Sequence, residues 1–351
     1  MNKPLFLSLA LSLSLVQCKK DNTDTNTINY STVLSNVTNQ VIIPTYADLY
    51  EKTQALLNSL TVLQQTPTAA NLEAARQAWR DTRIPWEQSE GFLFGPVEQQ
   101  GIDPSLDSWP VNQPDLDNVL NSSNALTKAY IDQQAGTLKG SHTLEYLLFG
   151  TDGSKQISNF TTRQYEYLRA CAESYNGDAQ RLYNGWLSTS GNYGAHLVDA
   201  GKAGNLYYPS QKSALQELLN GMITIADEVA NGKIQDPFIQ SNLTLEESRF
   251  SANSKADFAN NIRSIQNAYT GKYRNTAGEG LSKVVADKNA ALNTRVLQEI
   301  QDAITAIESI QGTFTSAVTN ARPSIENAQN KVRTLLQTLQ NEVLQLINGL
   351  E

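Results

Sequence analysis

The stretch GSHTLEYLLFG, residues 140–150, holds one of the two histidines of this 351-residue chain. His142 and Glu145 are three residues apart, so on a helix both side chains lie on one face and can reach the same ion. The pair is suited to binding a metal ion, to proton transfer, or to a hydrogen-bonded packing contact. Gly140 precedes it, and the apolar residues that follow indicate a short helix inserted between others, where an unpaired polar pair would be costly.

A single His-x-x-Glu pair cannot complete a metal site. Helical bundles that bind two metal ions use the reverse order, Glu-x-x-His, on more than one helix and add further glutamates. Other segments of this chain therefore have to supply oxygen ligands. The acidic residues whose local sequence best suits this role are Glu87, Glu90, Asp103, Asp107, Glu246 and Glu247.

A second group of polar residues surrounds the start of a helix predicted over 254–270. Such a group could form a capping and ion-pair network that joins two bundles, or it could form a ligand site, and both can hold together. Arg249 is of special interest, because a guanidinium near the glutamates would balance them in place of a metal or bind an anionic ligand. The residues of this group are Glu247, Ser248, Arg249, Ser251 and Asp257.

Other catalytic and cofactor motifs are missing from the sequence. The two histidines are 54 positions apart, which excludes a His-Glu-x-x-His zinc protease. No Gly-x-Ser-x-Gly elbow follows a strand, and no glycine-rich phosphate loop joins a strand to a helix. His196 has no acidic neighbour at helical spacing and is interpreted as a surface or packing residue. The aromatic residues expected in the core rather than in a substrate platform are Trp79, Trp86, Phe92, Phe94 and Trp109. Trp109 is in addition a candidate, with Gly140 and Asp107, for a ligand or interdomain site.

The elements that must position these residues are helices. Apolar residues recur three and four positions apart along most of the chain, and no pattern of period two occurs, so the sequence predicts an all-α fold. Two stripes near the C-terminus predict antiparallel bundle helices. Pro44 is expected to kink the first helix and Pro85 to bend the second. The predicted helices cover roughly 30–65, 69–93, 139–148, 160–188, 210–232, 254–270, 292–310 and 325–346.

The length of the chain favours two helical-bundle domains that pack together, because one hydrophobic core rarely organises so many residues. Glycine and asparagine concentrate between residues 191 and 204, so we expect domains over 30–195 and 196–351. The connections over 95–114, 150–158 and 191–209 are long, which in a helical protein is typical of functional or disordered segments. The first contains little low-complexity sequence, so it is expected to be ordered and packed against the bundle.

The N-terminus resembles a bacterial lipoprotein signal. A short apolar run follows Lys3 and ends at LVQC, which predicts a signal peptide over 1–17 and lipidation of Cys18. The polar residues 18–29 then form a tether, and the protein is expected in the cell envelope, attached to the membrane through this lipid alone. Cys171 is the one remaining thiol, so no disulfide can form within the chain. A net charge of −8 offers no field that would gather phosphate backbones, so nucleic acid is an unsuitable partner.

Four ordered blocks of sequence resemble the imelysin-like proteins: WEQSEGFLFGPV, IDPSLDSWP, GSHTLEYLLFG and ESRFSANSKADFANNIRSIQNAYTG. That family carries a Gly-x-His-x-x-Glu signature, which Gly140, His142 and Glu145 match here. The resemblance implies an all-α protein of two bundle-like domains with the signature residues near their interface. It also implies an association with bacterial iron uptake and its envelope components, and an assignment as a metallopeptidase of the insulin-cleaving type.

The two implied functions belong to different classes. A peptidase needs a metal-bound water and a general base beside an open cleft, whereas this sequence offers one histidine and one glutamate, and Glu145 can hardly be both ligand and base. We therefore favour an iron-linked protein that binds iron, zinc or a small ligand at an interdomain site, with His142 and Glu145 as ligands or as anchors of that polar site. A metal-dependent peptidase is the alternative, and a non-catalytic structural lipoprotein is a third hypothesis.

Overall fold

The computed structural model describes residues 29–350, and every regular element in that range is a helix. The prediction of an all-α fold is confirmed for this part of the chain. The predicted signal peptide, Cys18 and all of the tether except Asn29 lie outside the described residues. No helix of the described part is both long and apolar enough to cross a membrane.

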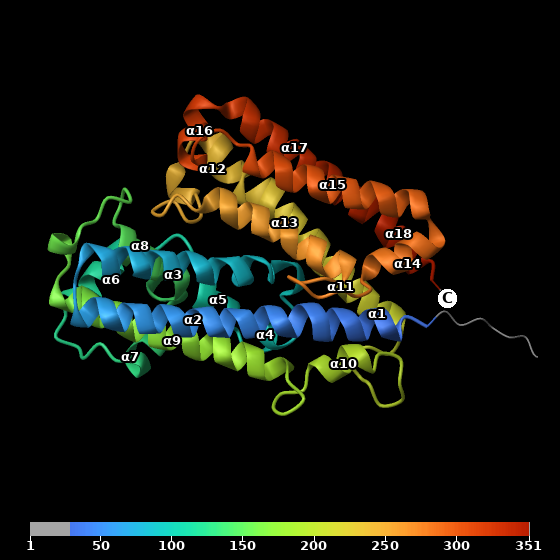
Figure 1. The fold of residues 1–351 in the computed structure, drawn as a ribbon, viewed down its shortest axis with the longest axis horizontal. Helices are drawn as coiled ribbons and strands as arrows, with labels where there is room; N and C mark the ends of the chain where they lie inside the picture. Colours follow the sequence, from blue (N-terminus) through green and yellow to red (C-terminus); the bar gives the residue numbers. More distant parts are fainter. Residues whose placement is uncertain (1–28, 351) are drawn as a thin grey trace, which may run out of the picture.

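The first helix group consists of α2 (Ile43–Gln65), α3 (Ala69–Glu87), α8 (Gly140–Phe149) and α9 (Thr162–Trp186). Helix α2 packs against both α3 and α9, and α8 packs against α3 and α9 from the other side. The second helix group consists of α11 (Gln211–Glu228), α13 (Ser254–Thr270), α15 (Ala290–Glu308) and α17 (Arg322–Thr338). Figure 1 shows α13 and α11 facing the first group, with α15 and α17 outermost.

Short elements connect these long helices. The segment 95–114, expected as an irregular ordered loop, is ordered but contains two short helices and the start of a third. The short elements are α1 (Ser31–Asn36), η1 (Val37–Ile42), η2 (Glu90–Phe92), α4 (Pro96–Gln99), α5 (Asp103–Asp107), α6 (Gln113–Leu120), α7 (Lys128–Asp132), η3 (Gly136–Leu138), η4 (Ile157–Asn159), α10 (Gly194–Val198), η5 (Val229–Lys233), α12 (Gln235–Gln240), η6 (Leu243–Leu245), α14 (Leu281–Lys288), α16 (Phe314–Asn320), η7 (Leu339–Val343) and α18 (Leu344–Asn348).

The first helix runs without a break through α1, the π-helical turn η1 and α2, and Pro44 lies where the wide turn ends. Proline has no N–H to donate to the carbonyl four residues earlier, that of Gln40. Oγ1 of Thr276 lies 3.3 Å from that carbonyl, but its closer acceptor is the carbonyl of Tyr273 at 2.7 Å. The disturbance expected at Pro44 is thus a widened turn, η1, beside the loop that joins α13 to α14. Pro85 lies inside α3, which ends two residues later.

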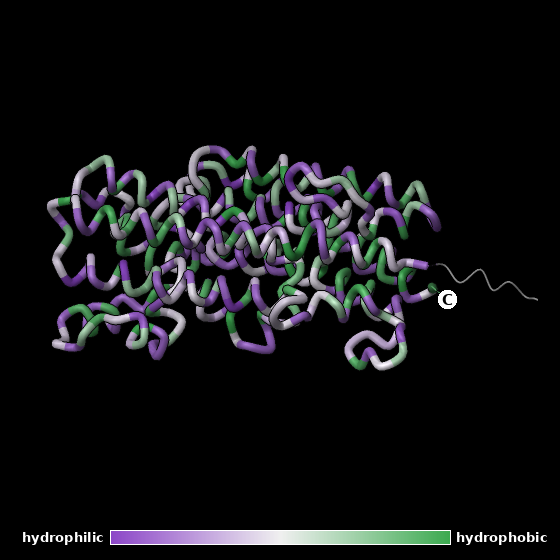
Figure 2. The backbone as a smooth tube through the Cα atoms, turned by 60° about the horizontal axis from the view of Figure 1, so that its bottom comes forward, coloured by the Kyte–Doolittle hydropathy of each residue, from purple (hydrophilic) through white to green (hydrophobic). Residues whose placement is uncertain are grey.

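The two C-terminal stripes are buried as predicted, with one change. Apolar residues of α15 and α17 fill the second group, but Leu346 is only partly buried and Ile347 takes the core position. The π-helical turn η7 holds more residues per turn than an α-helix, which moves the buried face along the sequence. Figure 2 shows this amphipathic pattern as alternating colours along the long helices.

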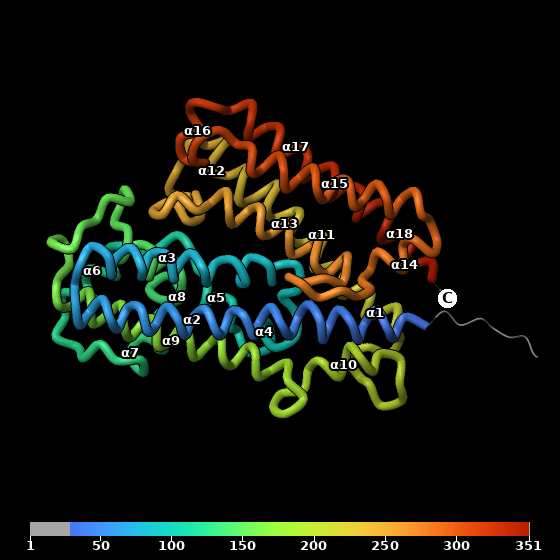
Figure 3. The backbone as a smooth tube through the Cα atoms, in the orientation of Figure 1, coloured from blue at the N-terminus to red at the C-terminus, as the bar shows by residue number. Residues whose placement is uncertain are grey.

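One continuous apolar core runs through both helix groups. The described chain also begins and ends at the same end of the molecule (Figure 3), where the backbone N–H of Tyr30 donates to Gln211 and Lys212 donates to the carbonyl of Leu350. The domain boundary placed between residues 195 and 196 falls inside α10 (Gly194–Val198), which packs against α1 and η1. A boundary after α10 would leave that helix whole.

The groups meet most closely where η2 lies between α11 and α13. Two glycines allow this contact. A Cβ atom added to Gly221 of α11 would lie 2.3 Å from the carbonyl oxygen of Gly91, and one added to Gly91 would lie 2.7 Å from Oγ of Ser264 on α13. The backbone of η2 therefore lies against the backbone of α11 on one side and against Ser264 of α13 on the other.

Substituting Gly221→Ala should destabilise the protein by about 1–3 kcal/mol, because the new methyl group would meet backbone rather than a mobile side chain. The measurement is the free energy of unfolding in urea. Gly232→Ala is the matched control, since its Cβ would meet nothing closer than Cγ of Glu228 at 4.0 Å. Equal stability of the two variants would contradict the close backbone contact.

Candidate metal centre

Gly140 sets the position of the whole Gly-x-His-x-x-Glu segment. It begins α8 with a φ of +76°, a conformation that favours glycine. A Cβ atom here would lie 2.5 Å from the carbonyl oxygen of Leu106 and 2.7 Å from that of Ser105. Glycine thus lets the start of α8 abut the backbone of α5, and this brings His142 beside Asp107.

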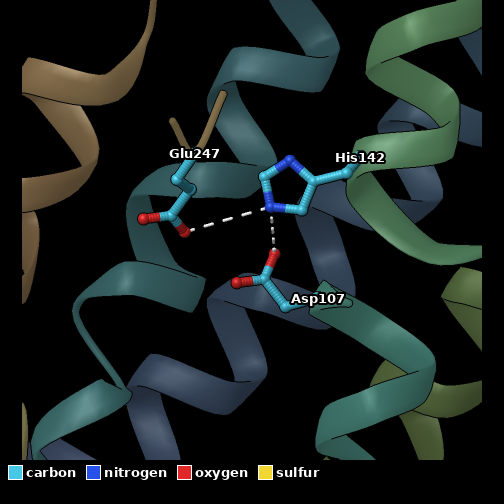
Figure 4. A group of neighbouring side chains, drawn as sticks. All are labelled: Asp107, His142 and Glu247. Carbon is cyan, nitrogen blue, oxygen red and sulfur yellow. Dashed lines mark ion pairs between the residues drawn. The ribbon is translucent and has the colours of Figure 1, made fainter. Parts of the chain in front are cut away.

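The two ring nitrogens of His142 face different partners. Its Nε2 lies 3.2 Å from Oδ1 of Asp107 and 3.9 Å from Oε1 of Glu247, as Figure 4 shows. Its Nδ1 lies 3.2 Å from Oε2 of Glu145. The ring is almost completely buried, at 2% exposure. One nitrogen therefore points to a pair of carboxylates from α5 and from the turn before α13, while the other is held within α8.

Glu145 is held on both of its oxygens. Oε1 accepts hydrogen bonds from the backbone N–H of Ser251 at 2.8 Å and from its hydroxyl at 2.7 Å. Oε2 faces the histidine ring. Metal-binding histidines commonly donate their second N–H to a carboxylate, which fixes the orientation of the ring. The geometry of Glu145 matches that supporting role rather than the role of a ligand on the ion that Nε2 would face.

Arg83 lies at the centre of the cluster and was not recognised in the sequence. Its side chain is fully buried and forms ion pairs with Glu87 of the same helix and with Asp107 of α5. It also pairs with Glu247 at 3.0 Å and with Asp257 of α13 at 3.5 Å. Arg83 lies four residues before Glu87, which is the spacing of an ion pair on a helix. This spacing was the one sequence feature that could have pointed to Arg83.

Lys233 is the second buried cation. It ends η5, and its Nζ lies 3.2 Å from Oε2 of Glu247 and 3.7 Å from both Glu87 and Glu90. Trp109 covers it, with the ammonium group 5.3 Å from the centre of the ring. The segment around Lys233 carries no spacing that would reveal this contact, because its partners come from distant parts of the chain.

Carboxylates outnumber cations in this buried cluster. Arg83, Lys233 and His142 are the cationic members, and the last is positive only when protonated. The six buried acidic side chains that surround them are Glu87, Glu90, Asp107, Glu145, Glu247 and Asp257. Burying uncompensated negative charge is unfavourable, so the cluster must bind either protons or a further cation.

The excess of carboxylates over cations raises the pKa values of several groups in the cluster. Burial and the neighbouring carboxylates raise the pKa of Glu247 to about 8 and that of Asp257 to about 7, although the adjacent cations oppose this. Burial lowers the pKa of His142, but the charge of Asp107 and the hydrogen bonds to Asp107 and Glu145 outweigh it and raise that pKa to about 10. Protons thus serve as the missing positive charge.

Two sets of three side chains in the described part could hold a metal ion, with ligand atoms within 4.8 Å of one another: Asp107, His142 and Glu247, and Glu87, Glu90 and Asp107. Bonds of about 2.1 Å place neighbouring ligand atoms about 3.0–3.4 Å apart. The 3.2 Å between Nε2 and Asp107 matches this range, whereas the 3.9 Å between Nε2 and Glu247 exceeds it. The two carboxylate oxygens nearest to Nε2 also accept hydrogen bonds from Arg83. Buried cations already contact both sets, since Arg83 pairs with Asp107 and Glu247 and Lys233 lies beside Glu87 and Glu90. The first set is the better fit for a metal ion because it adds an imidazole nitrogen that faces both of its carboxylates.

A pocket of about 240 Å³ leads from the surface to this cluster. Glu90 and Asp107 lie on its inner wall, Trp109 lies along its side, and Asp103 and Glu228 contribute carboxylates nearer to the solvent. Desolvation and the charge of Asp107 raise the pKa of Asp103 to about 6. The pocket offers a cation an acidic route inward but no open cleft for a polypeptide.

The remaining residues of the second polar group lie at different depths. Ser248 is buried with a φ of +50°, and its hydroxyl has no hydrogen-bond partner. Glu246 is buried but faces away, toward the hydroxyls of Ser254 and Thr315. Arg249 does not enter the cluster. It is half-buried above the ring of Phe250, and Arg83 occupies the place where a guanidinium was expected among the glutamates.

Replacing Arg83 with methionine should cost about 3–5 kcal/mol of stability at pH 7, because four buried carboxylates would lose their shared partner. Urea unfolding measures the loss. Arg295→Met is the control, since that arginine is half-exposed and its pair with Glu342 is worth about 0–1 kcal/mol. A folded Arg83 variant no less stable than the control would show that the carboxylates do not depend on this guanidinium.

Comparison with known proteins identifies the family of this chain. The chain is 29% identical over 313 residues to iron-regulated protein A of Synechococcus elongatus, covering 88% of this chain and 84% of that protein. The crystal structure of an iron-regulated protein A precursor from Parabacteroides distasonis matches with a TM-score of 0.81 and 28% identity, over 92% of this chain and 95% of the other.

An imelysin-like protein from Psychrobacter arcticum shares the fold, with a TM-score of 0.74 at 15% identity over 91% of this chain and 95% of the other. The sequence model of the imelysin family matches residues 42–348, which include the whole cluster around Arg83. The resemblance inferred from the four sequence blocks is thereby confirmed. The chain belongs to the imelysin family.

Proposed function

We propose that this protein binds a metal ion, with iron as the favoured metal, between Asp107, His142 and Glu247. The observation that carries the proposal is that the two ring nitrogens of His142 have different partners. Nε2 faces two carboxylates, while Nδ1 contacts Glu145. Two carboxylates and one imidazole suit iron and are also acceptable to zinc. The similarity to iron-regulated protein A supports iron as the metal to test first.

The site is better suited to binding than to peptide hydrolysis. Asp107, His142 and Glu247 are all at least 95% buried, so a polypeptide cannot reach an ion between them without a rearrangement of the fold. Glu145 is engaged on both oxygens and is not free to act as a general base. A metal-dependent peptidase is therefore the second candidate, supported by the family name alone.

The sequence supports further parts of the proposal. The protein is a lipoprotein of the bacterial cell envelope, anchored through Cys18, and it works with other envelope components in iron uptake. The two helix groups correspond to two domains, and the metal lies where they meet. That placement rests on the ligands themselves, because His142 belongs to the first group and Glu247 precedes α13 of the second.

Titration of ferrous, ferric and zinc ions into the chain, followed by calorimetry, tests the ligand set. One ion should bind per chain, and Asp107→Asn, His142→Gln and Glu247→Gln should each weaken binding by at least about a hundredfold. Glu145→Gln should cost about 10–100-fold, as expected for a residue that orients a ligand.

Glu246→Gln is the control, because that carboxylate is also buried and adjacent in sequence but faces two hydroxyls outside the site. It should bind the ion as the unsubstituted chain does. If no ion binds, or if the three ligand variants behave like this control, the cluster is a structural ion-pair network and the metal proposal fails.

Metal binding should release protons and strengthen as the pH rises from 6 to 8. At pH 7 His142, with a pKa of about 10, is protonated and must lose a proton before Nε2 can bind an ion. Glu247, with a pKa of about 8, is also largely protonated. The affinity should rise by up to about tenfold per pH unit for each proton released.

Calorimetry in buffers of different ionisation enthalpy counts the released protons directly. The His142→Gln variant, which lacks the titrating ring, is the comparison for any residual binding. Binding whose affinity and heat are the same in all buffers and at all pH values would contradict a site that exchanges protons for metal.

A further inference from the structure

A separate pocket of about 630 Å³ lies where the two helix groups meet, away from the acidic route described above. Its walls come from α3, from the loop after α8 and from the turn before α13. We call it the arginine pocket. The lining residues that carry the argument are Arg76, Arg80, Phe149, Arg249, Phe250 and Ser251.

Two of the three arginines have no carboxylate partner in the described part of the chain. Arg76 pairs with Glu73 and donates to the carbonyls of Leu148 and Lys155. Arg80 makes one long hydrogen bond, 3.5 Å, to the carbonyl of Ser251, and Arg249 makes no ion pair. Both are half-buried, so their charges are only partly compensated by solvent.

The acidic residues of the pocket are already occupied. Glu73 holds Arg76, and Asp152 accepts hydrogen bonds from the backbone N–H and the hydroxyl of Ser154. Neither forms an ion pair with Arg80 or Arg249. With three arginines and two carboxylates in its lining, the pocket has a surplus of one positive charge, in contrast to the surplus negative charge of the buried cluster.

Aromatic rings hold the two free guanidinium groups in place. Arg80 lies 4.8 Å from the centre of the Phe149 ring, and Arg249 lies 4.4 Å from that of Phe250. A guanidinium that stacks on a ring by its face keeps its N–H groups free at the edge, where they match the two oxygens of a carboxylate. The rings add apolar surface that suits a carbon skeleton.

We propose that the arginine pocket binds a small organic anion with two or more carboxylates, held by Arg80 and Arg249. The volume suits a ligand of this size, since small-molecule sites in proteins commonly measure about 300–1,000 Å³. Ser251 lies on the wall of the pocket and also donates both of its hydrogen bonds to Glu145. The anion site thus shares one residue with the support of His142.

Calorimetric titration of the full chain with tricarballylate, after removal of metal by a chelator, tests the proposal. Arg80→Gln and Arg249→Gln should each weaken binding by about tenfold or more, and the double variant should show none. Arg295→Gln, on the outer helix α15, should bind as the unsubstituted chain does. Because no metal is present, the outcome is independent of the proposed metal site.

Two further probes define the ligand class. The uncharged tricarboxamide analogue should not bind, and inorganic phosphate should bind much more weakly than tricarballylate. The proposal is overturned if tricarballylate does not bind, if the double variant binds it unchanged, or if phosphate binds equally well. Arg249 is itself partly exposed and makes no ion pair, so its variant keeps the test decisive even if Arg80→Gln impairs folding.

Discussion

The burial of Arg83 is the constraint on which the rest of the site depends. A guanidinium with no solvent exposure is tolerated only when charged partners surround it, and here four carboxylates do so from α3, α5, the turn before α13 and α13 itself. Satisfying one side chain therefore fixes the second helix group against the first. The backbone contacts at Gly91 and Gly221 allow the close approach that this arrangement requires.

Arg83 does not neutralise the cluster. The remaining excess of negative charge is the chemical basis of the proposed function. With Lys233 it compensates two of six buried carboxylates, and protons on His142 and on the weakest acids supply part of the remaining positive charge. A metal ion can replace these protons at the same place, because Nε2 of His142 lies between Asp107 and Glu247. Binding of the metal ion would then release these protons from the site.

Much of the fold could be predicted from the sequence, because the long helices carry regular apolar stripes. The short helices between residues 95 and 132 could not, since a single turn has no periodicity to detect. His142, Asp107 and Glu247 were named as candidate site residues from the sequence, and the structure places them side by side. Their arrangement was not, because which nitrogen faces which carboxylate depends on the contact of Gly140 with α5. Lys233 gave no signal, and Arg249 was favoured where Arg83 lies.

Ser251 connects the two proposed sites through hydrogen bonds alone. Its N–H and hydroxyl hold Glu145, and its carbonyl accepts from Arg80, so one residue on the turn before α13 contacts both the support of the imidazole and a free guanidinium. An anion that draws Arg80 toward itself would pull on the hydrogen bond between Arg80 and the carbonyl of Ser251. A shift of that residue would change its hydrogen bonds to Glu145, and through Glu145 it would act on the orientation of the His142 ring. Because such coupling is reciprocal, a bound metal would affect the affinity for the anion by the same factor.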